Sequence, residues 1–137
     1  YCQDNDVSWY DWAHVDEAFL EQVRALIAFR REHPLVSQRR FLGWAGSAGA
    51  TWWHASGRPM QETDWHNPHE RILGLELRAA DGADGLFLAV NPLDHPVVFA
   101  LPQGAWDVAA PFIDLARVED GLLHLDGLSV AALVPAD

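Results

Sequence analysis

The sequence predicts a mainly β protein, in which an antiparallel β-sandwich follows one amphipathic α-helix. Three observations predict this fold class. Near the N-terminus, apolar residues recur at the 3.6-residue spacing of a helix. After Pro34 the apolar period changes to two, which is the period of a strand. Short apolar runs then alternate with Gly, Pro and Asp residues, a pattern typical of sandwiches and barrels.

Residues 15–33 are expected to form the helix. Asp16 and Glu17 lie near its start and two arginines lie near its end, which matches the helix dipole. Pro34 ends the helix, because the residue before a proline avoids the helical region. A lone helix must bury its apolar face against something, either the sandwich or another domain. That face carries Phe19, Leu20, Val23, Leu26, Ile27 and Arg30.

The strands are expected to be short. Residues 86–90 form a near-continuous apolar run, which is typical of a strand buried on both faces. Turns are expected at 56–59 and 81–85, where Gly, Pro, Ser and Asp residues gather. Further strands are expected at residues 51–54, 71–78, 97–101, 106–108, 122–125 and 128–134.

The overall composition narrows the class of partner. The net charge of -11 disfavours nucleic acid, whose phosphates it would repel, and favours a neutral or cationic partner such as a neutral sugar. No apolar run approaches the roughly 18 residues of a membrane span, so no membrane partner is expected. Cys2 is the single cysteine, which excludes an internal disulfide and fits a reducing, cytoplasmic compartment.

The first residues are dense in rings, acids and amides. The run Tyr1-Cys2-Gln3-Asp4-Asn5-Asp6, followed by Ser8-Trp9 and Asp11-Trp12, resembles a segment late in bacterial glycogen debranching enzymes of the isoamylase type. These enzymes belong to the α-amylase superfamily. The likeness continues in the same order through 30–34, Thr51-Trp52-Trp53 with Gly57, and Asp64-Trp65, and it covers nearly the whole chain. Asp6 stands where Glu is common in the family.

The resemblance implies a fragment, because the chain starts directly at the first motif. Residues 1–37 would be the loop and last helix of a truncated (β/α)8 barrel, and 38–137 the C-terminal β-sandwich. The parent enzyme would hydrolyse α-1,6 branch linkages in glycogen or limit dextrin. The family's catalytic aspartate nucleophile, glutamate acid/base and third aspartate lie before this segment. We therefore assign no catalytic residue, cofactor or metal here and expect the chain alone to be inactive.

The N-terminal loop is the candidate for substrate contact. In the parent its rings would stack on sugar faces and its amides and carboxylates would bind hydroxyls, since barrel sites lie on loops after strands. The alternative is that the loop only supports the end of the barrel, with Trp9 and Trp12 as core anchors. The candidate substrate-adjacent residues are Tyr1, Gln3, Asp4, Asn5 and Asp6.

Tryptophans are also concentrated later in the chain. Trp52 and Trp53, with His54, Trp44 and Trp65, would suit an aromatic platform for an oligosaccharide. Adjacent strand residues point to opposite faces, however, so Trp52 and Trp53 cannot line one surface. Packing inside the sandwich is the favoured interpretation.

Two polar groupings have simpler interpretations than a site. His66, His69 and Glu70, with His54 nearby, have the residue types of a zinc site, but Asn67-Pro68 makes this segment a turn, which favours solvated histidines. Late acids would pair for acid/base work, but exposed loop acids are favoured in so acidic a chain. These acids are Asp114, Glu119, Asp120 and Asp126. Cys2 lacks a histidine partner in its sequence context and is rejected as a nucleophile.

The leading hypothesis is therefore a structural, C-terminal part of a glycogen debranching enzyme. Two alternatives from other classes stay open. One is a β-sandwich module that binds glucan itself through exposed aromatic residues. The other is a non-catalytic interaction domain that associates through the apolar face of its helix.

Overall fold

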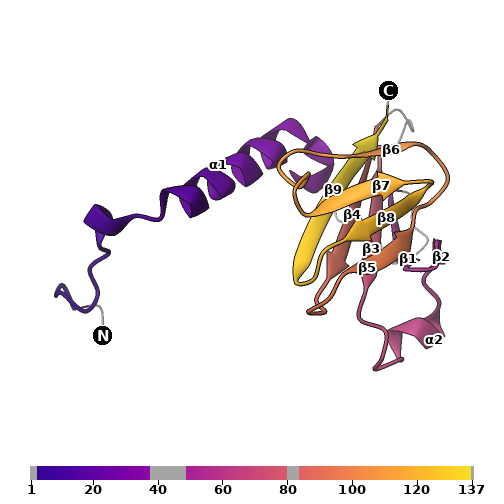
Figure 1. Ribbon diagram of the computed structural model, residues 1–137, viewed down its shortest axis with the longest axis horizontal. Coiled ribbons are helices and arrows are strands. Elements are labelled where there is room, and N and C mark those ends of the chain that lie inside the picture. The colour runs from indigo at the N-terminus through magenta and orange to yellow at the C-terminus, as the bar shows by residue number, and fades with distance from the viewer. Residues whose placement is uncertain (1–2, 38–48, 80–83, 137) are drawn as a thin grey trace.

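The computed structural model describes residues 3–37, 49–79 and 84–136. Two antiparallel sheets stack face to face, and one long helix extends from the sandwich (Figure 1). The predicted fold class is confirmed. The N-terminus lies at the far end of the helix arm and the C-terminus at the sandwich.

The helix α1 spans Glu17–Glu32, close to the predicted 15–33. It begins where the Asp16 side chain accepts a hydrogen bond from the Phe19 backbone N–H at 3.0 Å, the usual role of an N-cap acid. It ends at His33, before Pro34 as predicted. Short 3₁₀ helices flank it: η1 at Trp12–His14 and η2 at Pro34–Ser37.

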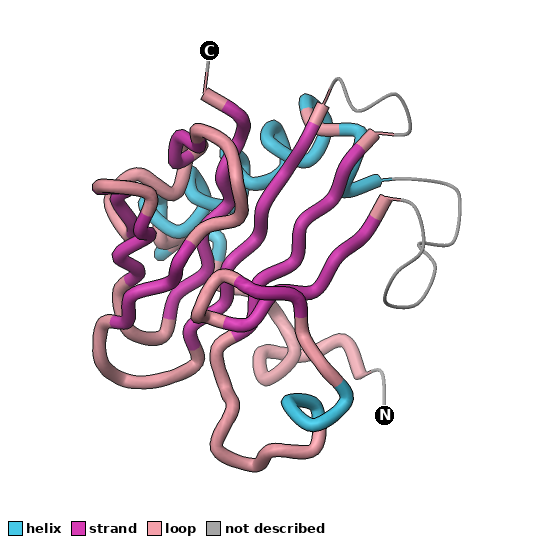
Figure 2. Tube along the Cα trace, turned by 90° about the vertical axis from the view of Figure 1, so that its right-hand side faces the viewer, coloured by secondary structure: helices cyan, strands magenta, loops and turns pink. Residues whose placement is uncertain are grey.

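The six-stranded sheet has the order β2-β1-β3-β4-β9-β6, and the three-stranded sheet has the order β5-β8-β7 (Figure 2). The strands of the larger sheet are β1 (Ala50–His54), β2 (Arg58–Pro59), β3 (Leu73–Arg78), β4 (Gly85–Asn91), β6 (Trp106–Val108) and β9 (Ser129–Pro135). Those of the smaller sheet are β5 (Val97–Ala100), β7 (Ala116–Glu119) and β8 (Leu122–Leu125). A four-residue helix, α2 (Glu62–Trp65), lies between β2 and β3.

The main core lies between the two sheets. Phe87 of β4 and Phe99 of β5 meet edge to face with ring centroids 5.3 Å apart, and both are fully buried. This is a favoured geometry for aromatic pairs. Gly74 of β3 lies beneath both rings, where an added Cβ would be 2.6 Å from a ring carbon of each. The two sheets therefore approach closely because position 74 has no side chain.

The opposite, outer face of the larger sheet is covered at one end only. Leu77, Leu86 and Ala132 are buried there, whereas Val90 and Val130 are 37% and 42% exposed. Phe29, near the end of α1, joins the buried cluster. Its ring meets Phe112 edge to face at 5.4 Å.

The N-terminal part of α1 lies away from the sandwich (Figure 1). Its apolar side chains Phe19, Leu26 and Ile27 are 63%, 45% and 46% exposed. The helix thus buries its C-terminal end against the sandwich and leaves most of its apolar face open. The sequence predicts that this face is buried by the sandwich or by another domain. Docking on the sandwich buries only its C-terminal end.

Several boundaries differ from the predictions. Arg58 and Pro59, expected in a turn, form strand β2, because the turn closes earlier, at Gly57 with φ of 79°. Gly85 is the first residue of β4 rather than part of the 81–85 turn, of which 81–83 lie outside the described residues. Helix α2 and strand β7 were not foreseen. The remaining differences concern ends: residues 71, 72, 101 and 128 lie outside the strands assigned to them, and Leu128 has φ of 52°.

One buried amide links two loops at the end of β4. Asn91 is 1% exposed, and its Nδ2 donates to the carbonyls of His95 and Asp126 at 2.9 and 2.8 Å. Its Oδ1 accepts from the backbone N–H of Leu93 at 3.1 Å. Both polar atoms of this side chain have hydrogen-bond partners, and these bonds offset the cost of removing the amide from water.

Among the residues that the structure describes, no helix is both long and apolar enough to cross a membrane.

We predict that Gly74→Ala lowers the free energy of unfolding by about 1–3 kcal/mol, because overpacking forces a shift of buried rings. Urea unfolding followed by circular dichroism measures the change. Gly85→Ala is the matched control on the neighbouring strand, since its nearest contact would be an ordinary 3.5 Å. Equal stability of the two variants would contradict the close approach of the sheets at position 74.

Candidate functional site

The candidate residues of the N-terminal segment form an exposed turn. Tyr1 lies outside the described residues. Gln3, Asn5 and Ser8 are tied together: the Asn5 side chain donates to Gln3 Oε1 at 3.2 Å, and Ser8 Oγ donates to the Gln3 carbonyl at 2.5 Å. Asn5 Oδ1 also accepts from the Val7 backbone N–H at 3.2 Å, which is an Asx turn.

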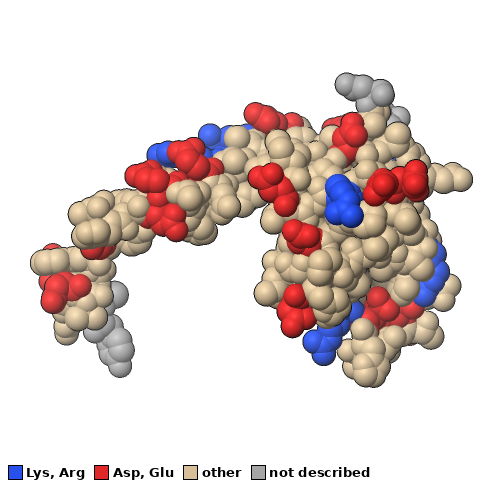
Figure 3. All heavy atoms as spheres, viewed as in Figure 1, with Lys and Arg blue, Asp and Glu red and all other residues tan. Residues whose placement is uncertain are grey.

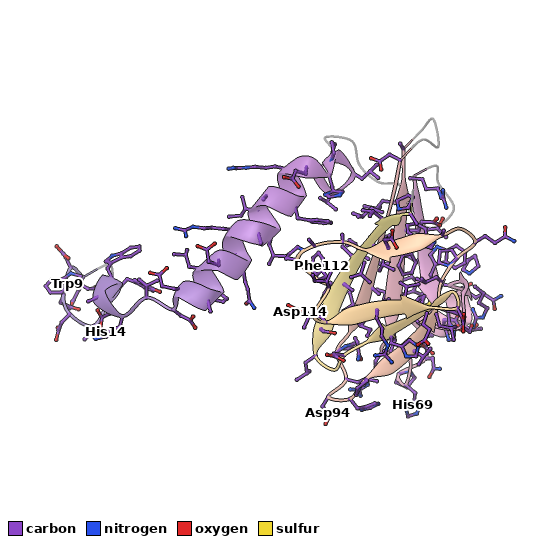
Figure 4. All side chains as sticks on the ribbon, turned by 45° about the horizontal axis from the view of Figure 1, so that its top comes forward. Trp9, His14, His69, Asp94, Phe112 and Asp114 are labelled. Atoms are coloured by element: carbon purple, nitrogen blue, oxygen red, sulfur yellow. The ribbon has the colours of Figure 1, made fainter. Side chains whose placement is uncertain are left out.

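The two acids of this segment differ in their contacts. Asp4 accepts a hydrogen bond from the indole N–H of Trp9, whereas Asp6 is exposed on the turn. The structure therefore brings Gln3, Asn5 and Asp4 into one small polar turn. Figure 4 shows Trp9 and His14 on this segment, well away from the sandwich.

Trp9 and Trp12 are not buried within this chain. They are 63% and 79% exposed, and Trp12 contacts the ring of Tyr10 with centroids 4.8 Å apart. A packing role for these indoles needs a surface that the described residues do not provide. The same holds for the apolar side chains of α1.

An apolar groove runs between α1 and the sandwich. It has a volume of about 470 Å³, and Leu26 of the helix faces Phe112, Leu115 and Val130 across it. The exposed Leu128, at 74%, continues this surface along the sandwich. The helix and the rim of the sandwich thus present one joined apolar surface, which the sequence periodicity indicated only for the helix.

The tryptophan cluster divides between the two faces of β1, as the strand period predicts. Trp53 packs against the core, and its indole N–H donates to the buried Glu76 at 3.1 Å. Trp52 lies on the other face, edge to face with Trp65 of α2, with centroids 5.7 Å apart. Trp65 is 43% exposed. Trp44 lies outside the described residues.

Two side-chain pairs hold α2 and the segment that follows it to strands β2 and β1. Arg58 of β2 donates to both carboxylate oxygens of Asp64, at 2.5 and 2.8 Å. That hydrogen bond, with a second from the Gln61 backbone N–H, holds the pKa of Asp64 well below its usual range. Asp64 in turn raises the pKa of Arg58. Bidentate pairs of this kind fix geometry as well as charge.

The second pair joins His54 and Glu70, two of the residues whose types suit a zinc site. His54 Nε2 lies 3.0 Å from Glu70, and His54 Nδ1 lies 2.7 Å from the Ser56 hydroxyl. His66 instead bonds the carbonyl of Glu62, at 2.8 Å, on its own helix. In the described part of the chain, no three His, Cys, Asp or Glu residues are placed to hold a metal ion.

The late acids face basic groups. Glu119 lies 4.0 Å from both Arg117 and His124. Asp114 and Asp126 line a cavity of about 190 Å³ that also contains Arg117 and His124. Figure 4 shows Asp114 at the surface of the sandwich. Glu119, Asp114 and Asp126 therefore each lie near basic side chains.

Comparisons with known proteins first identify the fold. No family model matches the chain. The fold matches part of a Paenibacillus barengoltzii pullulanase solved with maltohexaose and α-cyclodextrin: TM-score 0.64 and 22% identity, over 96% of this chain and 19% of that one. It also matches part of an α-glucosyl transfer enzyme, XgtA, with TM-score 0.57 and 24% identity, over 85% of this chain and 18% of that one. At these identities the likeness establishes the fold alone.

The sequence comparison is more specific. The glycogen debranching enzyme of Pectobacterium atrosepticum is 32% identical over 136 residues, which are 98% of this chain and 19% of that enzyme. That of Cronobacter sakazakii is 32% identical over 113 residues, 82% of this chain and 16% of that enzyme. The resemblance seen in the sequence is confirmed: the chain is similar to one segment of bacterial glycogen debranching enzymes. It spans about a fifth of their length.

We predict that Asp64→Asn lowers the urea midpoint of unfolding at pH 7, because it removes the carboxylate charge and one of the two oxygens that accept from Arg58. A lowered pKa in the folded state stabilises above the pKa of the unfolded carboxyl, about 3.9, and this stabilisation is lost as the pH falls further. The gap between wild type and Asp64→Asn should therefore be full at pH 5 and narrow at pH 3.

Glu62→Gln, an exposed position in the same helix, serves as the control for this experiment and should leave the midpoint unchanged. A gap between wild type and Asp64→Asn that stays constant from pH 5 to pH 3 would mean that the carboxylate charge of Asp64 is not what holds α2.

Proposed function

We propose that this chain is the C-terminal part of a cytoplasmic enzyme that hydrolyses α-1,6-glucosidic branch linkages in glycogen or limit dextrin. The observation that carries the proposal is the match, over 98% of the chain, with a glycogen debranching enzyme. Within that enzyme we assign the chain a structural role. Residues 1–37 would complete a (β/α)8 barrel, and 38–137 would form the accessory sandwich.

The structural role is supported by apolar surface that the described residues leave uncovered. Large exposed apolar patches on a protein usually mark an interaction surface. The exposed apolar side chains here are Phe19, Leu26, Ile27 and Leu128. Burying such side chains stabilises by roughly 25 cal/mol for each Å² of apolar area. The barrel domain of the longer enzyme is the proposed partner for this surface.

The carboxylates of the described residues support a non-catalytic assignment. Retaining glycoside hydrolysis uses two carboxyl groups about 5 Å apart, one of them held protonated. Here the three best-shielded carboxylates are each bound to another side chain: Asp64 to Arg58, Glu70 to His54, and Glu76 to Arg78. An acid engaged in this way is not free to protonate a glycosidic oxygen.

The N-terminal turn is proposed to lie at the rim of the glucan cleft in the longer enzyme. Tyr1, Gln3, Asp4, Asn5 and Asp6 would contact the sugar there. The turn is preorganised by the hydrogen bonds of Asn5 and Ser8, which lowers the entropy cost of ordering it around a ligand. The exposure of its polar groups agrees with such a role.

A chimera tests the proposed function directly. The matching segment of the Pectobacterium atrosepticum enzyme is replaced by this chain, and release of reducing ends from limit dextrin is measured. We expect the chimera to be active, the enzyme truncated before the segment to be inactive or insoluble, and the isolated 137-residue chain to release none. Turnover that rises with the concentration of the pure isolated chain would overturn the non-catalytic assignment, and an inactive but folded chimera would overturn the proposed parent.

A second prediction concerns the apolar face of α1. In the isolated chain Phe19→Glu should leave the free energy of unfolding within about 0.5 kcal/mol, because the side chain is exposed and an acid suits the first turn of a helix. In the chimera the same change would bury a carboxylate against the barrel and should lower the thermal midpoint by several degrees. Arg24→Glu, on the charged face, is the control and should leave that midpoint nearly unchanged. An equal effect of both variants would exclude docking through the apolar face.

A further inference from the structure

Trp65 is an exposed tryptophan at the end of helix α2, which side-chain contacts hold in place. Trp65 is 43% exposed, and its ring meets that of Trp52 at an interplanar angle of 85° with centroids 5.7 Å apart. Helix α2 has only four residues, so its own backbone hydrogen bonds do not explain its stability. The support comes from side chains instead, and it keeps the indole in one place at the surface.

Three sets of contacts hold this support. Arg58 grips both oxygens of Asp64, and Asp64 also accepts from the Gln61 backbone N–H at 2.8 Å in a capping box. In the segment between α2 and β3, Glu70 is paired with His54 of β1. The Met60 backbone N–H donates to the Trp52 carbonyl at 2.8 Å. A large apolar ring that is held in place by these contacts and is still exposed to solvent indicates a binding site for a ligand.

The surroundings of Trp65 favour a neutral polar ligand with one flat apolar face. The Arg58 side chain, which pairs with Asp64 of α2, is 41% exposed, so a hydrogen-bond donor is accessible beside the helix that carries the indole. The net charge of -11 opposes anionic polymers, and acidic side chains are spread over the face seen in Figure 3. A glucose ring has this character, because its C–H faces stack on an aromatic ring while its hydroxyls meet polar groups.

The site is also distant from the surface proposed to meet the barrel. Helix α2 lies at the end of the sandwich remote from α1 (Figures 1 and 2). In Figure 4, His69, which follows α2, is well separated from Phe112, where the helix packs. Docking of the apolar face of α1 would therefore leave Trp65 accessible.

We propose that Trp65, backed by Trp52, is an accessory binding site of the sandwich for α-glucan chains. The choice of sugar rests on the proposed function, whereas the position of the site rests on the geometry above. Such a site would hold an outer chain of a branched polymer and raise its local concentration at the enzyme without taking part in hydrolysis.

Affinity electrophoresis of the isolated chain through native gels with and without glycogen tests this site. Wild type should be retarded by glycogen, Trp65→Phe less so, and Trp65→Ala should bind at least about tenfold more weakly, as for the loss of a central aromatic contact. Trp12→Ala is the matched control: it removes another exposed indole, 79% exposed on the N-terminal segment, and should migrate as wild type does. Unretarded wild type, or equal loss in Trp12→Ala and Trp65→Ala, would overturn the proposal.

A measurement on the wild-type chain covers the case in which Trp65→Ala fails to fold. Maltoheptaose is titrated while the indole N–H resonances are followed by NMR, with the Trp65 signal assigned from its absence in Trp65→Phe. Trp65 is expected to shift most, whereas no shift, or a shift of Trp9 alone, would overturn the site. Failure here is distinct from failure of the proposed function, because an active chimera without glycogen retardation removes only the accessory site.

Discussion

The structure depends on one close approach between its two sheets. Gly74 leaves space for the rings of Phe87 and Phe99, and the register places small residues beside it, Ala89 and then Ala131 on the adjoining strands. This row of small side chains lets a ring from the opposite sheet reach the centre of the sandwich. The register of β3, β4 and β9 is fixed by the same row, since a one-residue slip would turn every side chain to the other face. The outer face, which carries the helix, Trp52 and Trp65, takes its orientation from this inner packing.

That outer face changes character along its length. Leu77 and Leu86 are sealed at one end, whereas Val90 and Val130 are open at the other. The helix shows the same change, from buried Phe29 to exposed Phe19. The sequence relationship covers only about a fifth of the length of the debranching enzymes. The open apolar surface therefore supports the proposed position beside a larger domain on physical grounds, independently of the sequence comparison.

Local patterns in the sequence predicted those parts of the fold that local physics controls. The helix from Glu17 to Glu32 follows from its spacing, its charged ends and Pro34, and the split between Trp52 and Trp53 follows from the strand period. Strand β7 was missed because Arg117 and Glu119 dilute its apolar signal to two residues. Helix α2 was missed because its hold on Arg58 is a contact between side chains and leaves no periodic trace.

The candidate site was less accessible to sequence reasoning. Pairing of His54 with Glu70 spans 16 positions and that of Trp53 with Glu76 spans 23, and both depend on the register of β1 with β3. Residue types alone grouped His54 with His66 and His69, whereas the fold separates them. The joined apolar surface likewise needed the position of Leu128 and Val130 beside the helix, which no pattern in either segment contains.

The asparagines have a consequence for the chemical durability of the protein. All three side chains accept a hydrogen bond from the backbone N–H two residues onward. Two of them, Asn67 and Asn91, are followed by proline. Spontaneous deamidation begins when the next backbone nitrogen attacks the side-chain carbonyl, and a proline nitrogen carries no hydrogen for that step. The amide of Asn91, whose two donors join the neighbouring β4–β5 and β8–β9 loops, is thereby protected from the slow hydrolysis that would replace those donors with a carboxylate.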